Sequence, residues 1–354
     1  MSFVHLISYL VYYLHKGTVV SDKPLGAFLQ STPFHISQND PCFTKGPYNR
    51  RGQLYNDHMD PARYESLFTR GKEQDRTTAF GHFHPNKDSL TGEYDFDAPF
   101  ITIAEKTHEG KDAWYFTQPK FENRYRNKPP KLRNYLQYTF SRLKELELNE
   151  PGNFFIESAD KNWICFNSGL QDKHSADLFC VFERYTGISE TPVSDWVYKG
   201  TETARSPVFR LHFGMKLPKL AIYSSDSRDY VFNTDYTLDT DIFEHMFDRA
   251  KERSGFPPEA TDESVGNYLR GAIENLIPKI RRNYKTAIPV YYIAEGRMQL
   301  LLPFHSSNGT EISCFLVERD DTNRCYSIKT ILDMDQAYFN ARLITRPDKE
   351  WLNP

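Results

Sequence analysis

Four short apolar runs near the C-terminus, separated only by turns, limit the possible folds of this chain more than any other feature. Two of the connections contain the turn dipeptides Glu295-Gly296 and Asn308-Gly309. Connections this short join neighbouring strands that run in opposite directions, so the pattern predicts an antiparallel meander. The four runs cover residues 288–293, 297–303, 312–318 and 325–331.

Two longer stretches have the spacing of amphipathic helices, with apolar residues three and four apart. Pro278 lies inside the second helix and should kink it, because its ring removes a backbone donor. The first stripe consists of Leu132, Tyr135, Leu136, Phe140 and Leu143. The second helix is expected over residues 263–283, with a stripe of Val265, Tyr268, Leu269, Ala272, Ile273, Leu276 and Ile280.

A short helix should follow the meander. Asp333 is placed to cap it, with Gln336 in the reciprocal position of a capping box, and Pro347 limits its length. Earlier in the chain, alternating and apolar patterns predict further β-structure. The expected segments are strands over residues 163–166 and 178–183, β segments near 208–213 and 220–223, and a hairpin between 80–83 and 94–103.

Together these patterns predict an α+β fold with a mainly antiparallel sheet, two main helices and a short C-terminal helix. Residues 1–95 are expected to form an N-terminal appendage that consists of a helix, an irregular segment rich in Gly and Pro, and the hairpin. The remaining residues, 96–354, are expected to form the C-terminal α+β domain.

Charge and cysteine usage narrow the class of protein. The 44 Lys and Arg residues nearly balance the 47 Asp and Glu residues, which excludes a nonspecific nucleic-acid coat and makes any such contact local. The five cysteines form no CxxC pair, which indicates reduced core residues in a cytoplasmic protein. The apolar run over residues 3–14 is too short to span a bilayer and lacks the basic start of a signal peptide. We therefore expect no membrane partner, and we expect this run to form a helix that docks a possible protein partner.

A dense group of polar and aromatic residues follows the second helix directly. Arg binds phosphate through a planar fork and Lys binds it as a point charge. Arg281 and Lys285 are therefore candidate ligands for a phosphate-bearing molecule. The alternative is a helix C-terminus whose solvated cations complement the helix dipole.

The final predicted helix carries a second candidate group. Asp335, Tyr338 and Arg342 share one helix face through steps of three and four residues, and Asn340 shares a face with Gln336. Such a group can orient a base or sugar while Arg342 contacts phosphate. The structural alternative is an ion pair between Asp335 and Arg342 that anchors the helix.

A basic and aromatic stretch over residues 120–138 is the third candidate. Cations that hold the backbone, together with rings that stack on bases, are typical of single-stranded RNA binding. The alternative is a solvated connector with a few anchoring rings. The residues expected to contact RNA are Lys120, Arg124, Tyr125, Arg126, Lys131 and Arg133.

Metal and cofactor signals are weak. His82 and His84 would point the same way on a strand, but no third ligand has a fixed spacing, so no metal site is predicted. The sequence contains no P-loop and no GxGxxG, GxSxG or HExxH motif, and it indicates no cofactor.

Several C-terminal segments carry a resemblance to a known family. They are RRNYKTAIPVYY at 281–292, QLLLP at 299–303 and AYFNARLITRPDKEWL at 337–352, with weaker matches at 135–143 and 165–170. These segments resemble an uncharacterised domain-of-unknown-function family over about residues 100–352. Asp333 and Gln336 stand where that family's pattern has Thr and Met, and Pro278 also departs from it. The family often occurs beside OST-HTH/LOTUS RNA-binding modules in bacterial and fungal proteins, so the resemblance implies an RNA-linked role without an established reaction.

With the resemblance, Asn167 joins the candidate ligand-binding residues, because an amide and the permissive Gly169 end a predicted strand. Three hypotheses of function follow from these candidates. The alternatives to recognition are a phosphodiesterase or nuclease in which Asp335 acts as general base or metal ligand, and a protein-interaction module that uses the N-terminal helix. The leading hypothesis is recognition of RNA or a nucleotide by Asn167, Arg281, Lys285, Tyr338, Asn340 and Arg342.

Overall fold

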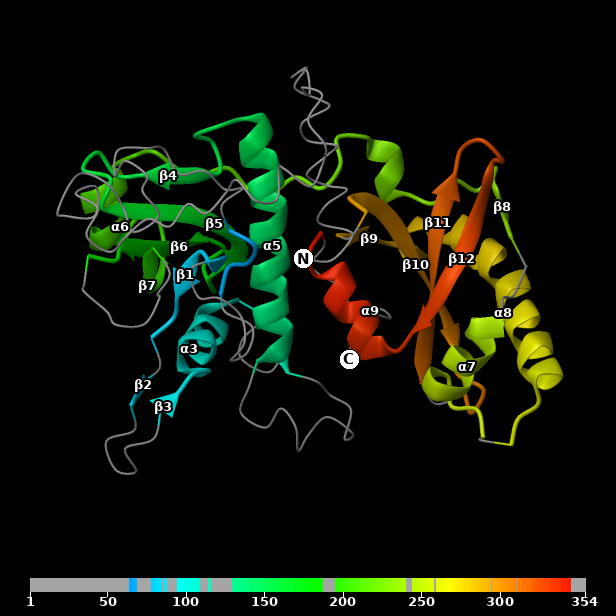
Figure 1. Cartoon of the computed structure of the whole chain (residues 1–354). Coiled ribbons are helices and arrows are strands. Elements are labelled where there is room, and N and C mark those ends of the chain that lie inside the picture. Colours follow the sequence, from blue (N-terminus) through cyan, green and yellow to red (C-terminus); the bar gives the residue numbers. More distant parts are fainter. Residues whose placement is uncertain are drawn as a thin grey trace, which may run out of the picture. The chain divides into compact units, whose positions relative to one another are not determined.

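The computed structural model describes residues 64–68, 78–84, 86–87, 94–108, 114–115, 129–186, 195–239, 244–257, 259–293, 295–309 and 311–344. The chain divides between His58 and Met59, and every described residue belongs to the unit Met59–Pro354. The predicted N-terminal helix over residues 3–14 therefore lies outside the described residues. Within the unit, two five-stranded sheets with their helices confirm the predicted α+β class (Figure 1).

The first sheet has the strand order β1-β7-β6-β5-β4. Neighbouring strands are antiparallel except at one edge, where β1 pairs in parallel with β7. The strands predicted over residues 163–166 and 178–183 are confirmed and are longer than expected. Their bounds are Gly81–His82 for β1, Phe155–Glu157 for β4, Trp163–Gln171 for β5, Asp177–Arg184 for β6 and Trp196–Glu202 for β7.

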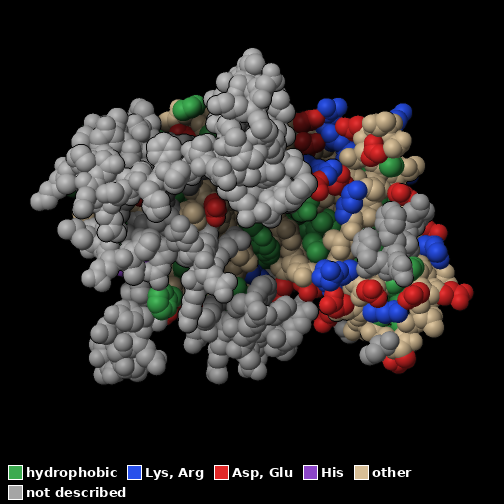
Figure 2. Space-filling view, viewed as in Figure 1, with side chains coloured by type: hydrophobic (Ala, Val, Ile, Leu, Met, Phe, Trp, Pro, Cys, Tyr) green, Lys and Arg blue, Asp and Glu red, His purple; other side chains and the backbone are tan. Residues whose placement is uncertain are grey.

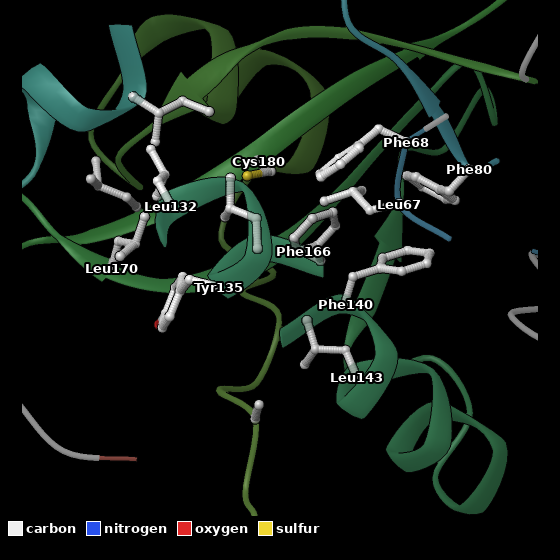
Figure 3. Close-up of a cluster of buried hydrophobic side chains, with 14 of the residues drawn as sticks. Leu67, Phe68, Phe80, Leu132, Tyr135, Phe140, Leu143, Phe166, Leu170 and Cys180 are labelled. Carbon is white, nitrogen blue, oxygen red and sulfur yellow. The ribbon is translucent and has the colours of Figure 1, made fainter. Parts of the chain in front are cut away.

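Helix α5 (Pro130–Asn149) packs its predicted apolar stripe into the core of this first sheet. Phe80 directly precedes β1, and the centre of its ring lies 5.1 Å from that of Phe140 in α5. The ring centres of Phe140 and Phe166 of β5 are 5.9 Å apart (Figure 3). Such close ring contacts bury much apolar area, which explains why this half of the unit uses so many Phe residues.

Two segments predicted as β-structure are helices instead. Residues 98–106 form α3 (Ala98–Lys106), which has Pro99 in its first turn, and residues 207–213 form α6 (Pro207–Phe213). The Ser206 hydroxyl caps α6 by accepting a hydrogen bond from the Phe209 amide. Proline has a helix-compatible φ and needs no donor in a first turn, so these start signals outweighed the local apolar pattern.

The predicted N-terminal hairpin is correspondingly shorter. It is reduced to β2 (Asn86–Lys87) and β3 (Tyr94–Asp95), which pair in antiparallel fashion. Residues 220–223 form no strand.

The second sheet confirms the predicted meander. Strands β9 to β12 follow one another in antiparallel pairs, and β8 (Thr237–Leu238) joins β12 in parallel at the edge. The meander strands are Ile288–Tyr292 for β9, Arg297–His305 for β10, Ile312–Asp320 for β11 and Cys325–Leu332 for β12.

Helices cover both faces of the second sheet (Figure 1). Helices α7 (Glu244–Arg253) and α8 (Asp262–Arg282) pack on the face that carries Leu300 and Leu302, whereas α9 (Met334–Ala341) packs on the face that carries Leu301. Successive strand residues point to opposite faces, so this alternation places α8 and α9 on opposite sides of the sheet. The sequence patterns predicted α8 and α9 but not α7.

The structure also tests the predictions about the cysteines and about a membrane-spanning segment. Four cysteines among the described residues are free thiols, and Cys165, Cys180 and Cys314 are buried, as predicted for core residues. In the part of the chain that the structure describes, no helix combines the length and the apolar composition needed to cross a bilayer.

Candidate functional site

The C-terminal end of α8 presents the first predicted cluster to solvent. The residues here named the α8-end cluster are all exposed, and the Tyr284 side chain is 65% exposed. The predicted ligands Arg281 and Lys285 therefore lie on one accessible surface. The α8-end cluster consists of Lys279, Arg281, Arg282, Tyr284 and Lys285.

Buried residues on both sides hold this cluster in place. Ile280 in the last turn of α8 and Ala287 before β9 belong to the same core. Between them, the helix ends at Asn283, whose side-chain oxygen accepts a hydrogen bond of 3.1 Å from the Lys285 amide. The chain then makes one 3-10 turn, η6 (Tyr284–Thr286). The anchored ends fix the backbone, and the large polar side chains project outward.

The α8-end cluster is locally basic. Among the described residues, no carboxylate forms an ion pair with Lys279, Arg281 or Arg282. Arg281 makes only a long contact of 3.5 Å, from Nη2 to the Thr234 carbonyl oxygen. These cations sit at the C-terminal end of α8, where positive side chains complement the negative end of the helix dipole.

The second predicted cluster is buried. Asp335 is 1% exposed, and its Oδ1 lies 2.8 Å from Nζ of Lys131 on α5. The same Nζ lies 4.9 Å from the centre of the Tyr338 ring. Burial lowers the pKa of the Lys131 ammonium, and the hydrogen bond to Asp335 offsets part of that effect. Asp335 and Tyr338 thus share a helix face as predicted, but this face packs against α5.

Arg342 lies in the same buried region. The centre of its guanidinium group is 5.3 Å from the Trp114 ring and 5.5 Å from the Tyr135 ring, and the residue is 8% exposed. Contacts of this kind hold a guanidinium through cation–π attraction in a place where water is scarce. The structural alternative expected Arg342 to pair with Asp335, whereas the ion pair found at Asp335 is the one with Lys131.

The two candidate amides make local hydrogen bonds. Asn340 donates to the Gln336 carbonyl oxygen at 2.7 Å, within α9. Asn167 is 3% exposed, and its Oδ1 accepts a hydrogen bond of 2.9 Å from the Gly169 amide. That bond lies within β5, at the β-bulge where its pairing with β6 shifts register. Both amides are therefore used by their own backbone.

Only part of the basic stretch over residues 120–138 can be placed. Lys131 is buried in the ion pair with Asp335, and Arg133 donates to Asp97 at 3.0 Å while lying over the Phe68 and Phe100 rings. The Lys131 ammonium is thus closed to an RNA chain, whereas the Arg133 side chain stays 33% exposed. Lys120, Arg124, Tyr125 and Arg126 lie outside the described residues.

The structure therefore brings together some of the predicted residues and separates others. Arg281 and Lys285 lie at the end of α8, whereas Tyr338, Asn340 and Arg342 lie on or directly after α9, on the opposite face of the second sheet. Asp335 meets Lys131, a residue that the sequence pattern had placed in a different candidate group. The predicted residues thus form an exposed group and a buried group.

A polar depression on the second sheet contains residues that the sequence patterns did not single out. It is a small, shallow depression beneath the 3-10 turn η5 (Ser227–Tyr230). Arg319 at its wall pairs with Asp229 at 3.0 Å and with Asp321 at 3.0 Å. No spacing rule could have found it, because it exists only where η5 folds onto β10 and β11. Its cations are already matched by carboxylates, which leaves little charge for a ligand.

The two histidines of the weak metal signal have their rings close together, although only His82 belongs to a strand, β1, and His84 follows it. The His82 and His84 ring centres are 4.6 Å apart. Across the described ranges, however, no group of three or more His, Cys, Asp or Glu side chains is arranged to hold a metal ion.

Comparison with known proteins gives a family but no reaction. A family profile whose description reads domain of unknown function, DUF3825, matches residues 106–351. No curated protein and no solved structure matches the chain. The matched range includes α5, both sides of the second sheet and the α8-end cluster, so the family spans both groups of candidate residues.

Proposed function

The chain belongs to the DUF3825 family, and because that family's description assigns no reaction, we propose from its own geometry that it recognises RNA or a nucleotide through the α8-end cluster. The segments that include residues 281–292 resemble an uncharacterised family that often occurs beside OST-HTH/LOTUS RNA-binding modules, and this resemblance supports an RNA-linked role by association.

One observation carries the proposal: an aromatic ring that is 65% exposed stands among exposed cations on a rigid turn. Tyr284 offers a face on which a base can stack, and Arg281 and Arg282 offer planar forks for phosphate oxygens. This combination suits a single-stranded nucleic acid, whose bases are accessible for stacking.

The surrounding charge makes the contact local rather than general. Figure 2 shows Lys and Arg side chains interspersed with Asp and Glu over the visible part of the second half of the unit. Such a surface has no extended positive field to attract any polyanion. Binding would therefore depend on the few side chains of the α8-end cluster.

We propose recognition without hydrolysis. The hydrolytic hypothesis depends on Asp335, and this carboxylate is buried and paired with Lys131. A general base or metal ligand must reach its substrate, which a carboxylate in this position does not.

The first test measures the binding of a fluorescein-labelled oligouridylate by anisotropy over a range of salt concentrations. The variant Arg281→Gln with Arg282→Gln should bind at least about tenfold more weakly. Its salt slope should fall by about 1.4, because each lost phosphate contact on a single strand removes about 0.7. The control Lys173→Gln removes an exposed cation in the β5–β6 turn and should change neither value.

The second arm tests the ring. Tyr284→Ala should weaken binding by about 1–3 kcal/mol, while Tyr284→Phe should retain it, since stacking needs the π-face rather than the hydroxyl. Tyr292→Ala, which removes a ring that is 41% exposed at the far end of β9, is the matched control. Wild-type protein that binds neither the oligomer nor mononucleotides, or cluster variants that bind normally, would refute the proposal.

A further inference from the structure

The segment that follows β7 exposes apolar side chains next to cations. Leu211 is 79% exposed and Met215 is 93% exposed, the two largest exposed fractions among the large apolar side chains of the described residues. Arg210 and Lys216 are exposed directly beside them. We name residues 205–217 the apolar-basic strip, whose exposed members are Arg205, Val208, Arg210, Leu211, Met215, Lys216 and Leu217.

The strip has a fixed outward face because its inward face is anchored. Phe209 and Phe213 of α6 are buried, and the Phe209 ring lies 4.8 Å from Phe179 of β6. His212 stacks on Trp163 of β5 at 3.9 Å. With these rings packed on the first sheet, Val208 and Leu211 of α6, which are three residues apart, are left on the solvent side, and Met215 just after the helix is exposed as well.

Charge along the strip has one sign. The sequence contains no Asp or Glu from residue 203 to residue 225, whereas Arg205, Arg210, Lys216 and Lys219 fall in that range. Lys219 pairs with Glu150 at 2.9 Å, so Arg205, Arg210 and Lys216 supply the charge next to the apolar tips. An occupant of this surface must therefore be both apolar and anionic.

We propose that the apolar-basic strip docks on the surface of a membrane that contains anionic lipids. Protruding leucine and methionine side chains enter the boundary between head groups and acyl chains, and basic residues beside them attract anionic head groups. The Met215 side chain is 93% exposed and so does not line a groove of the kind that binds a partner helix. The expectation of no membrane partner was based on the lack of a spanning segment, and the strip would lie on the surface without spanning the bilayer.

The test is co-sedimentation of the full chain with phosphatidylcholine vesicles that contain or lack phosphatidylserine. Wild-type protein should partition onto the anionic vesicles and far less onto the neutral ones. Leu211→Ser with Met215→Ser should reduce that partitioning at least tenfold, and Arg210→Gln with Lys216→Gln should reduce it on the order of 30-fold. All four side chains are exposed, so the fold should persist, which circular dichroism checks.

Matched variants distinguish binding through this surface from nonspecific hydrophobic adsorption and from binding through the α8-end cluster. Val231→Ser changes another apolar residue, 44% exposed, and Arg281→Gln with Arg282→Gln removes the same charge elsewhere. Both should leave vesicle binding unchanged, and the strip variants should bind RNA normally. The proposal is overturned by wild-type protein that does not partition, by strip variants that partition normally, or by strip variants that only abolish self-association in solution.

Discussion

At the scale of single residues, Gly169 shows how a backbone and its surroundings can both exclude a side chain. Its φ is +75°, in the region that favours glycine, and an added Cβ would lie 2.4 Å from the hydroxyl oxygen of Tyr135. Tyr135 cannot easily retreat, because its ring packs against Trp114 at 5.5 Å and lies beside Arg342. This position of β5 therefore favours glycine over every other residue type.

We predict that Gly169→Ala destabilises the protein more than Gly152→Ala does. Gly152 has nearly the same φ, +76°, but nothing lies within 4 Å of the position of its Cβ. The Gly152 variant should lose about 1 kcal/mol of unfolding free energy from backbone strain alone. The Gly169 variant should lose a further 1–3 kcal/mol or so from overpacking against Tyr135. Urea unfolding measures both values, and equal losses would show that the contact with Tyr135 is easily relieved.

The sequence indicated a permissive backbone at Gly169 but not the environment of the candidate site. The predicted strand end is instead a register shift within β5, where the Gly169 amide donates to the Asn167 side chain. The burial of Asp335 depends on Lys131, which reaches it from a distant helix. Spacing along one helix identifies a shared face but cannot show what covers that face.

At the scale of elements, the N-terminus of α9 confirms a prediction made from two residues. The Asp333 side chain accepts from the Gln336 amide at 2.9 Å, and the Gln336 side chain accepts from the Asp333 amide at 3.4 Å. This reciprocal capping box satisfies two backbone donors that a helix start leaves open. It also fixes where α9 begins and so where Asp335 stands.

We predict that Asp333→Ala costs about 1–2 kcal/mol of unfolding free energy, whereas Asp333→Asn costs a few tenths, because Asn keeps the capping oxygen. Thr261→Ala is the comparison, since Thr261 caps α8 through a single hydrogen bond of 3.2 Å from Ser264. A large loss in the Asn variant would instead assign the effect to the negative charge of Asp333 near Lys131. Thermal and urea unfolding of the three variants decide between these readings.

Elements with long periodic patterns or a clear capping signal were predicted, whereas several short elements were not. The stripes of α5 and α8 and the four runs of the meander each supply many consistent positions. The short helices α3 and α6 have apolar patterns that suit a strand equally well, and only their prolines mark a helix start. The parallel pairing of β1 with β7 joins residues far apart in the chain, so no local pattern carries it.

At the scale of the whole unit, a few polar and aromatic contacts join the helix of the first sheet to the strands and helix of the second. Arg142 of α5 donates to the hydroxyl of Tyr291 in β9 at 3.1 Å, and the Tyr138 ring lies 5.4 Å from Phe339 of α9. The Lys131–Asp335 pair is the charged member of this set, with side chains 2% and 1% exposed. The buried predicted residues therefore contribute to the contacts between the two halves of the unit, whereas the α8-end cluster lies exposed on the surface.

We predict that the Lys131–Asp335 pair couples the unfolding of the two halves. Lys131→Met leaves Asp335 buried without this partner and should cost about 3–5 kcal/mol, with the second sheet melting earlier than the first. Combining it with Asp335→Leu should recover most of that loss, because two apolar side chains can pack where the charges stood. Lys251→Met breaks the exposed pair with Asp262, at 2.7 Å, and should cost under about 1 kcal/mol.

Urea unfolding followed by both tryptophan fluorescence and circular dichroism measures the losses and any separation of the two transitions. A double variant no more stable than Lys131→Met would mean that the pair's geometry, rather than its uncompensated charge, holds α5 against α9.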